Sequence, residues 1–268
     1  MKIAMAQMNI IWESKEENKV KCIDMVKEAK ANLAGIIVFP EMTLTGFTMN
    51  TMDFAEPEEN QPTLDFFLAL SKKYEIAIAF GMAVSGEKGV HNRLYIVKNG
   101  EVILSYDKIH PFTHGLEGEF YVGGERLETV EIDGIRFGAS ICYDLRFPEV
   151  YQLQADEADA ILVIANWPSV RKKHFHVLLH ARAVENQCYI IGVNRTGKGG
   201  GMKYSGGSVI VMPDGNTLTE ETKDETIIYG EISKDEVEKN RDKFSIRADR
   251  KEHLYQRLWK LKHNKSHN

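Results

Sequence analysis

Apolar runs of strand length alternate with segments of helical periodicity along most of the chain. The apolar runs predict buried strands, which we expect at 2–9, 36–39, 76–84, 135–141, 160–165, 189–193 and 227–232. Between several of these runs, apolar residues recur with the spacing of an amphipathic helix. We expect these helices to begin near residues 14, 62, 149, 171 and 233. Strands that alternate with helices are typical of an α/β protein.

Turn residues between other apolar runs predict hairpins. Asn99-Gly100 separates two such runs, and this dipeptide is favoured in the tight turn of a β-hairpin. Asp133-Gly134 marks a second hairpin that leads into a strand. With the alternating strands and helices, these hairpins fit either one mixed sheet or two packed sheets with helices outside.

We expect a single domain over residues 1–268, because no linker rich in Pro, Gly or Ser divides the chain. Residues 244–268 form a charged and aromatic C-terminal tail. Its apolar side chains predict burial against a partner subunit, because a patch of this kind is rarely left in water. They are Phe244, Leu254, Trp259 and Leu261.

Composition and charge exclude several classes of protein. The 268 residues carry a formal net charge of −5, with 43% hydrophobic and 27% charged residues, which excludes a disordered or fibrous protein. No basic stripe is present, so we expect no nucleic-acid partner. The longest apolar runs, such as 160–165, are too short to span a bilayer, so we expect no membrane partner.

The cysteines indicate a reducing compartment. The chain holds three, Cys22, Cys142 and Cys188, and this odd, widely spaced set fits neither a disulfide framework nor a Cys-x-x-Cys metal site. The N-terminal segment carries Gln7 and Asn9 and has no long apolar stretch, so it predicts a strand rather than a signal peptide. We therefore expect a cytoplasmic protein.

Three polar residues stand after predicted strands and are candidates for one site: Glu41, Lys108 and Cys142. Ligands of α/β folds gather at the carboxyl ends of strands. Each residue alone is also compatible with a solvated surface charge or, for the cysteine, with packing as a small hydrophobic residue. Together they are able to perform acyl transfer, in which a thiol attacks, a carboxylate acts as its base and a lysine stabilises the oxyanion.

Three blocks around these residues resemble the signatures of the nitrilase, or carbon–nitrogen hydrolase, superfamily. They are residues 39–47 (FPEMTLTGF), 106–110 (YDKIH) and 140–149 (SICYDLRFPE). The similarity continues to about residue 232 through 165–168 (ANWP), 181–187 (ARAVENQ), 192–195 (GVNR) and 204–208 (YSGGS). Within the superfamily, the CYDLRFP and NWP segments look most like the ω-amidase branch.

The resemblance implies an α/β fold, a four-layer α-β-β-α sandwich of the nitrilase type, and a role for each residue. Cys142 is the nucleophile, and Glu41 is the general base that takes its proton and later passes it to departing ammonia. Lys108 stabilises the oxyanion together with the backbone N–H of Tyr143. The fold usually dimerises through helices into an eight-layer assembly, so the resemblance also implies a homodimer or a higher homo-oligomer.

The superfamily has a second catalytic glutamate in the loop after the lysine. Glu117 and Glu119 are both candidates, and we favour Glu117 because the residues that follow at 120–121 align it better. The resemblance implies no cofactor and no metal. His176 and His180 have a spacing that could hold zinc on a helix, but no third ligand is evident, and we expect no metal site there.

The activity implied by the resemblance is hydrolysis of a small-molecule C–N bond. The leading substrate is the terminal amide of a 2-oxo-dicarboxylate ω-amide, cleaved through a cysteine thioester with release of ammonia. The same residues also serve nitriles, N-carbamoyl amino acids or deaminated glutathione in the superfamily. The alternative from another class is a catalytically silent binding protein. We favour it less, because all three catalytic positions hold the residue types that the chemistry needs.

Two more residues are candidates for substrate binding beside Tyr143. Arg146 is able to bind a carboxylate through two hydrogen bonds, but we favour a salt bridge to Asp144 or Glu149 that shapes the turn after the nucleophile. Trp167 either lines the pocket or supports its wall.

Overall fold

A computed structural model describes residues 1–265 of the chain and the side chains of residues 1–261. Within these residues, one large sheet has the order β14 (Thr226–Glu231), β1 (Lys2–Gln7), β2 (Ile36–Val38), β4 (Ala77–Gly86), β5 (Gly89–Lys98) and β6 (Glu101–Asp107), with β3 (Glu56–Pro57) beside β4. The other has the order β13 (Val209–Val211), β10 (Tyr189–Asn194), β9 (Ala160–Ala165), β8 (Ile135–Ile141) and β7 (Val130–Ile132). A small hairpin joins β11 (Thr196–Gly199) to β12 (Met202–Ser205).

The central strands of both sheets are parallel. In the first sheet β1 pairs with β2 and β2 with β4 in this way, and in the second sheet β9 lies parallel to β8 and to β10. Strands β5 and β6 then add to β4 as antiparallel hairpins, which makes β6 run in the same direction as β4. The carboxyl ends of several strands in each sheet therefore lie at the same edge of that sheet.

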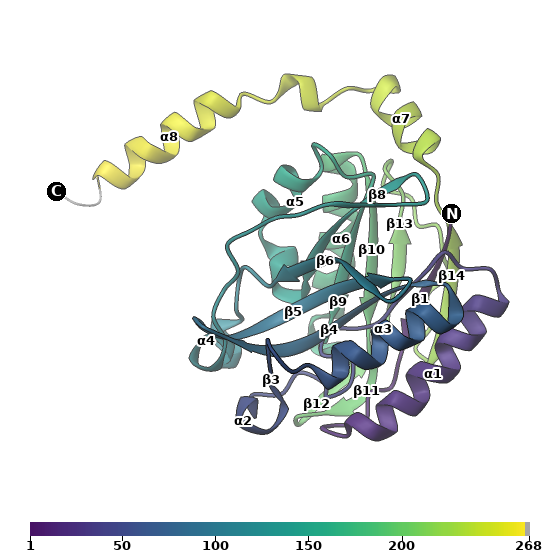
Figure 1. Ribbon diagram of the computed structural model, residues 1–268. Coiled ribbons are helices and arrows are strands. Elements are labelled where there is room, and N and C mark those ends of the chain that lie inside the picture. Colours follow the sequence, from purple (N-terminus) through teal and green to yellow (C-terminus); the bar gives the residue numbers. More distant parts are fainter. Residues whose placement is uncertain (266–268) are drawn as a thin grey trace.

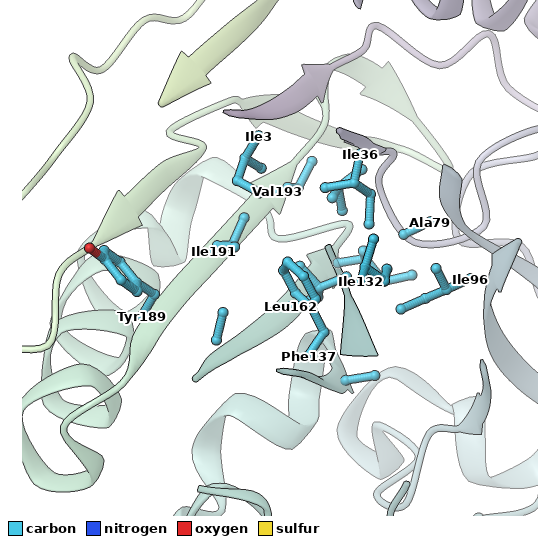
Figure 2. Packing of buried hydrophobic residues seen from close by; sticks show 14 of the residues in the cluster. Ile3, Ile36, Ala79, Ile96, Ile132, Phe137, Leu162, Tyr189, Ile191 and Val193 are labelled. Carbon is cyan, nitrogen blue, oxygen red and sulfur yellow. The ribbon is translucent and has the colours of Figure 1, made fainter. Parts of the chain in front are cut away.

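The two sheets pack face to face through an apolar core. Ile3, Ile36 and Ile96 from the first sheet meet Phe137 and Leu162 from the second, and all five side chains are buried (Figure 2). Each of these strands also presents apolar residues on its other face, so both faces of each sheet must be covered.

Helices cover the two outer faces. Helices α1 (Lys15–Ala31) and α3 (Pro62–Tyr74) pack on the first sheet, and α5 (Pro148–Gln154) and α6 (Lys172–Asn186) pack on the second (Figure 1). This arrangement confirms the expected α-β-β-α sandwich and selects two packed sheets over one mixed sheet. The five expected helices begin within one residue of their predicted starts. The remaining helices near the body are α2 (Thr51–Phe54), α4 (Glu117–Phe120) and the 3₁₀ turns Thr113–Gly115, Cys142–Arg146 and Ser169–Arg171.

The predicted hairpin turns are confirmed by their backbone angles. Asn99 and Gly100 have φ of 55° and 82°, and Asp133 and Gly134 have φ of 49° and 82°. A type I′ turn needs positive φ at both central positions, which Asn, Asp and Gly tolerate better than other residues.

The C-terminal segment runs along and then away from the sandwich. Helix α7 (Lys234–Lys243) follows β14, and after the 3₁₀ turn Arg247–Asp249 helix α8 (Glu252–Lys265) extends outward (Figure 1). The single domain over 1–268 stays a prediction, and the end of its predicted tail, 266–268, lies outside the described residues. Within the described part of the chain, no helix combines the length and apolar character needed to cross a bilayer.

Candidate active site

Strand ends from both sheets meet at one edge of the sandwich. Lys108 follows β6 of the first sheet, and Glu41 lies three residues beyond the end of β2 in the same sheet. Cys142 follows β8 and Asn166 follows β9 in the second sheet. Face-to-face packing of the sheets thus gathers side chains that are far apart in the sequence.

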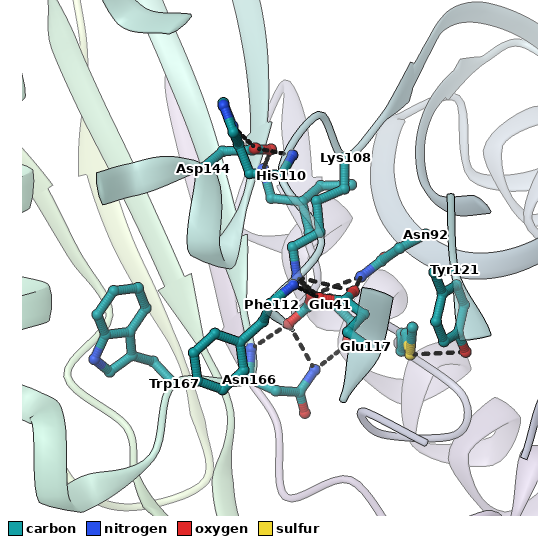
Figure 3. Close-up of polar contacts among 12 residues, drawn as sticks. Glu41, Asn92, Lys108, His110, Phe112, Glu117, Tyr121, Asp144, Asn166 and Trp167 are labelled. Carbon is teal, nitrogen blue, oxygen red and sulfur yellow. Dashed lines mark hydrogen bonds and ion pairs between the residues drawn. The ribbon is translucent and has the colours of Figure 1, made fainter. Parts of the chain in front are cut away.

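Lys108 lies between two carboxylates. Its Nζ is 3.0 Å from Oε1 of Glu41 and 2.8 Å from Oε2 of Glu117, and Figure 3 shows the ammonium pointing at both. All three side chains are buried. Burial alone would lower the pKa of Lys108, but the two carboxylates together raise it above its ordinary value. The lysine is therefore a fixed ammonium ion.

Two asparagines hold the carboxylates in place. The side-chain amide of Asn92 donates to Oε1 of Glu41 at 2.7 Å and to Oε1 of Glu117 at 3.0 Å. The backbone N–H of Asn166 donates to Oε2 of Glu41 at 2.8 Å. Sequence reasoning assigned neither residue a role, although Asn166 lies in the ANWP segment. Nothing in the local pattern around Asn92 marks it, since it stands inside a hairpin strand.

The two glutamates of the lysine loop differ in burial and contacts. Glu117 is buried and contacts Lys108, whereas Glu119 is exposed. The geometry places Glu117, rather than Glu119, beside Lys108, and its role as the second catalytic glutamate stays a prediction.

Cys142 stands in a strained turn. Strand β8 ends at Ile141, and Cys142, with φ of 47°, is the first residue of the 3₁₀ turn Cys142–Arg146. A positive φ is unfavourable for a residue with a β-carbon, and such strain persists only where the surroundings enforce it. The turn places Cys142, which is half-buried, in the lining of a cavity.

Burial and the neighbouring carboxylates raise the pKa of Cys142. Burial raises its pKa well above the ordinary value, and the Glu41 carboxylate raises it further, against the opposing effect of the Lys108 ammonium. Because the thiolate is the nucleophilic form, attack needs a base that removes the proton as the new bond forms.

A cavity of about 580 Å³ opens onto this cluster, a size that suits a small molecule. Cys142 and Lys108 line it, as do Tyr143 and Trp167, and Trp167 is itself almost fully buried. The indole N–H of Trp167 donates to the backbone carbonyl of Arg171 at 2.8 Å, so this ring both lines the pocket and braces its wall. Further aromatic lining residues are Trp12, Phe47, Phe112 and Tyr204.

Arg146 lines the cavity but does not form the expected salt bridge. Within the described side chains, no ion pair joins it to Asp144 or Glu149, so that favoured interpretation is wrong. The Asp144 carboxylate is already occupied by other donors, and Arg146 instead stacks with its guanidinium carbon 4.9 Å from the centroid of the Trp167 ring.

Arg171 also lines the cavity, and sequence reasoning missed it. Its guanidinium carbon lies 5.5 Å from the centroid of the Phe112 ring. Among the described residues it has no carboxylate partner, like Arg146. Arginines stacked on rings keep their N–H edges free for a planar anion. Two cationic groups of this kind, at one cavity, favour an anionic ligand.

No metal-binding cluster emerges from the part of the chain whose side chains are described, where no group of three or more His, Cys, Asp or Glu is suitably arranged. His176 contacts Glu221 through Nδ1 at 2.9 Å, and Nδ1 of His180 lies 2.8 Å from the His176 carbonyl oxygen. Nδ1 of each histidine thus contacts a neighbouring protein group.

Sequence comparisons identify similar proteins over most of the chain. The family profile described as carbon-nitrogen hydrolase matches residues 2–242. The protein named omega-amidase YafV from Yersinia enterocolitica is 37% identical over 212 residues, which cover 79% of this chain and 81% of that protein. The 2-oxoglutaramate amidase of Bacillus subtilis (strain 168) is 31% identical over 256 residues, which cover 94% of this chain and 98% of that protein.

Solved structures share the same architecture. A CN-hydrolase superfamily protein from Xanthomonas campestris, solved with an arsenic adduct in its active site, matches with a TM-score of 0.88 at 30% identity and covers 93% of this chain and 97% of its own. Nit3 of Saccharomyces cerevisiae, a member of branch 10 of the nitrilase superfamily, has a TM-score of 0.84 at 25% identity and covers 92% and 94%. The predicted nitrilase-type fold is therefore confirmed.

We expect Glu117→Gln to lower the pKa of Cys142, because it removes a negative charge that raises that pKa. Alkylation by iodoacetamide, followed across pH by mass spectrometry of the Cys142 peptide, should then begin at lower pH. Glu119→Gln is the matched control, since this exposed side chain lies two residues away, and it should leave the profile unchanged. An unshifted profile for Glu117→Gln would contradict the electrostatic coupling described above.

Proposed function

The chain belongs to the carbon–nitrogen hydrolase family, and we propose that it is an amidase that cleaves the terminal amide of a 2-oxo-dicarboxylate ω-amide. The observation that carries this proposal is the buried ammonium of Lys108 between Glu41 and Glu117, at the cavity that Cys142 lines. The names of two relatives, omega-amidase and 2-oxoglutaramate amidase, support the substrate class.

In the first half of the proposed reaction, Sγ of Cys142 attacks the carbon of the terminal amide while Glu41 takes the thiol proton. The carbonyl oxygen becomes an oxyanion, which the Lys108 ammonium and the backbone N–H of Tyr143 stabilise. Glu41 then returns the proton to the amide nitrogen, the C–N bond breaks, and ammonia leaves. The acyl group remains on the sulfur as a thioester.

In the second half, a water molecule takes the place that ammonia has left. Glu41 removes one proton from the water as its oxygen attacks the thioester carbon, and Lys108 again stabilises the oxyanion. The C–S bond breaks, the proton returns to Sγ of Cys142, and the carboxylic acid leaves. The net reaction consumes one water and releases one ammonia, and it calls for no redox change.

Glu117 serves this chemistry by fixing the lysine. Its carboxylate accepts hydrogen bonds from Lys108 at 2.8 Å and from Asn92 at 3.0 Å, and both of its oxygens are within 3.0 Å of Nζ. With Glu117 holding one side of the ammonium, Glu41 is free to change its protonation state during turnover without releasing Lys108 from its position.

Arg146 and Arg171 support the choice of an anionic amide. Both line the cavity and both lack a carboxylate partner among the described side chains. The carboxylate at the far end of a 2-oxo-dicarboxylate ω-amide would supply that partner, which a simple nitrile would not. N-carbamoyl amino acids and deaminated glutathione also carry carboxylates, so a substrate screen must include them.

We propose that the protein works as a homodimer or larger homo-oligomer in the cytoplasm. Helix α8 exposes Tyr255, Leu258, Trp259 and Leu261, each with 45–53% of its surface accessible. Together with α5 these side chains border a cavity of about 690 Å³. A partner subunit would cover this apolar face. The three free cysteines support a reducing compartment, since Cys142 has to stay a thiol.

We expect the wild-type protein to release ammonia from a 2-oxo-dicarboxylate ω-amide faster than from nitriles or N-carbamoyl amino acids. Cys142→Ala should keep the fold, checked by circular dichroism, and abolish this release, because no other group forms the thioester. Cys22→Ala, which alters a buried thiol on α1, is the control and should stay active. Persistent turnover by Cys142→Ala would refute the assignment of the nucleophile.

Arg171→Met should lower kcat/KM for the carboxylated ω-amide by about tenfold to a hundredfold, the usual effect of losing a hydrogen bond to a charged group. A neutral monoamide of similar length makes no such contact, so its kcat/KM should change little. The measurement is ammonia release from both substrates under the same conditions. Equal losses on the two substrates would argue against a carboxylate contact at Arg171.

Size-exclusion chromatography with light scattering should report at least a dimer. Trp259→Glu places a charge on the exposed face of α8 and should shift the protein towards the monomer. Lys260→Glu, which also adds negative charge to this helix but removes no apolar side chain, is the comparison variant. A monomeric wild-type protein at micromolar concentration would remove the oligomer from the proposal.

A further inference from the structure

A third buried carboxylate lies just behind the cluster of Lys108, Glu41 and Glu117. Asp144 stands two residues after Cys142, is fully buried, accepts three hydrogen bonds and contacts a ring nitrogen of His110. Its Oδ1 accepts from the backbone N–H of His110 at 2.9 Å and lies 2.9 Å from Nδ1 of the same residue. Its Oδ2 accepts from the Tyr106 hydroxyl at 2.7 Å and from the backbone N–H of Ile141 at 3.2 Å. Figure 3 shows the contact between Asp144 and His110 above Lys108.

The partners of this carboxylate come from two segments that otherwise belong to different sheets. Tyr106 lies two residues before Lys108, and His110 lies two residues after it. Ile141 immediately precedes Cys142. A single side chain therefore connects both flanks of the lysine to the turn that carries the thiol.

We propose that Asp144 is a positioning residue that sets the placement of the Lys108 ammonium relative to the Cys142 thiol. This inference rests on the roles proposed above for these two residues. Oxyanion stabilisation depends steeply on the geometry of the donor, so a displacement of Lys108 by a fraction of an ångström lowers the rate while the fold stays intact.

The chemistry of the contacts requires a carboxylate at this position. An ionised carboxylate only accepts hydrogen bonds, and the groups around Asp144 are able to donate. Burial and the neighbouring Asp144 charge raise the pKa of Tyr106 well above its ordinary value, so its hydroxyl stays protonated and donates. No lysine or arginine among the described side chains pairs with Asp144, whose charge is stabilised by these hydrogen bonds instead.

The same contacts hold the strained turn. Cys142 has φ of 47°, and the hydrogen bond from Ile141 to Asp144 closes the chain around it. On the other side, the His110 ring stacks on Phe147 with the ring centroids 3.6 Å apart, directly after the 3₁₀ turn Cys142–Arg146. The lysine loop and the nucleophile turn are thus fastened together on both sides of Asp144.

Asp144→Asn is the sharpest test, because the amide has nearly the same shape as the carboxylate but cannot accept hydrogen bonds at both of its ends. One of its two ends is an NH₂ group, which would face either the backbone N–H of His110 or that of Ile141. Neither backbone group is able to become an acceptor, so one of the two segments must move away. The substitution therefore uncouples the lysine loop from the nucleophile turn in either amide orientation.

We expect Asp144→Asn to lower kcat for the ω-amide by about tenfold or more while KM changes little, since a displaced oxyanion donor acts on the transition state. We also expect the pH profile of Cys142 alkylation by iodoacetamide to move to higher pH. Lys108 lowers the pKa of the thiol, so its displacement leaves the thiol harder to ionise. A merely structural role would not move this profile in the folded protein.

Asp159→Asn is the matched control. Asp159 is also a buried aspartate that accepts a backbone hydrogen bond, from Arg136 at 3.0 Å, but it lies at the opposite end of β8. The Asp159→Asn variant should be less stable than the wild-type protein, but its kcat per folded molecule and its alkylation profile should not change. Tyr106→Phe removes the hydrogen bond from the Tyr106 hydroxyl to Asp144. It should shift kcat and the alkylation profile in the same directions as Asp144→Asn, but by less. If Asp144→Asn does not fold, Tyr106→Phe alone tests the inference.

Two results would overturn the inference. One is an unshifted alkylation profile with wild-type kcat in folded Asp144→Asn, or in Tyr106→Phe if the former does not fold. The other is an equal shift in Asp159→Asn, which would trace the effect to general loosening. Failure of the proposed function is separate, since it would appear as persistent ammonia release by Cys142→Ala.

Discussion

The structure of the site depends on the ammonium ion of Lys108, which is buried away from solvent. Lys108 is buried, and removing such a charge from solvent costs several kcal/mol unless opposite charges and hydrogen bonds replace the lost hydration. Glu41 and Glu117 supply the charges, and Asn92 satisfies both carboxylates at once. None of these groups is stable in the interior alone, so the site exists only when the segments that carry them are assembled together.

The sandwich makes that assembly possible. Parallel strands in each sheet end at the same edge, and the packing of one sheet on the other brings the edge that bears Lys108 against the edge that bears Cys142. The tightly packed core between the sheets leaves little freedom for the strand ends to shift. The rigid part of the molecule thus holds the charges, while the loops beyond the strands form the wall of the cavity.

The elements of the fold and the residues that meet at the candidate site could be predicted from the sequence because their signals are local. Apolar runs predict strands, Asn99-Gly100 predicts its turn, and the motif segments mark Cys142 and Lys108. The partners of these groups could not be predicted in the same way. The importance of Asn92 and Arg171 is evident only from their contacts with residues that are distant in the chain. The salt bridge expected for Arg146 was wrong, since proximity in sequence says little about which donors a buried carboxylate selects.

The raised pKa of Cys142 has a consequence for its oxidation. Peroxides and other oxidants react with thiolates far faster than with thiols, and a sulfur oxidised beyond the sulfenic acid is generally lost. Burial, and after it the Glu41 carboxylate, raise the pKa of this sulfur well above its ordinary value, which lowers the share of the anion that oxidants attack. The same burial and charge that raise the pKa of Cys142 therefore also lower its reactivity towards oxidants.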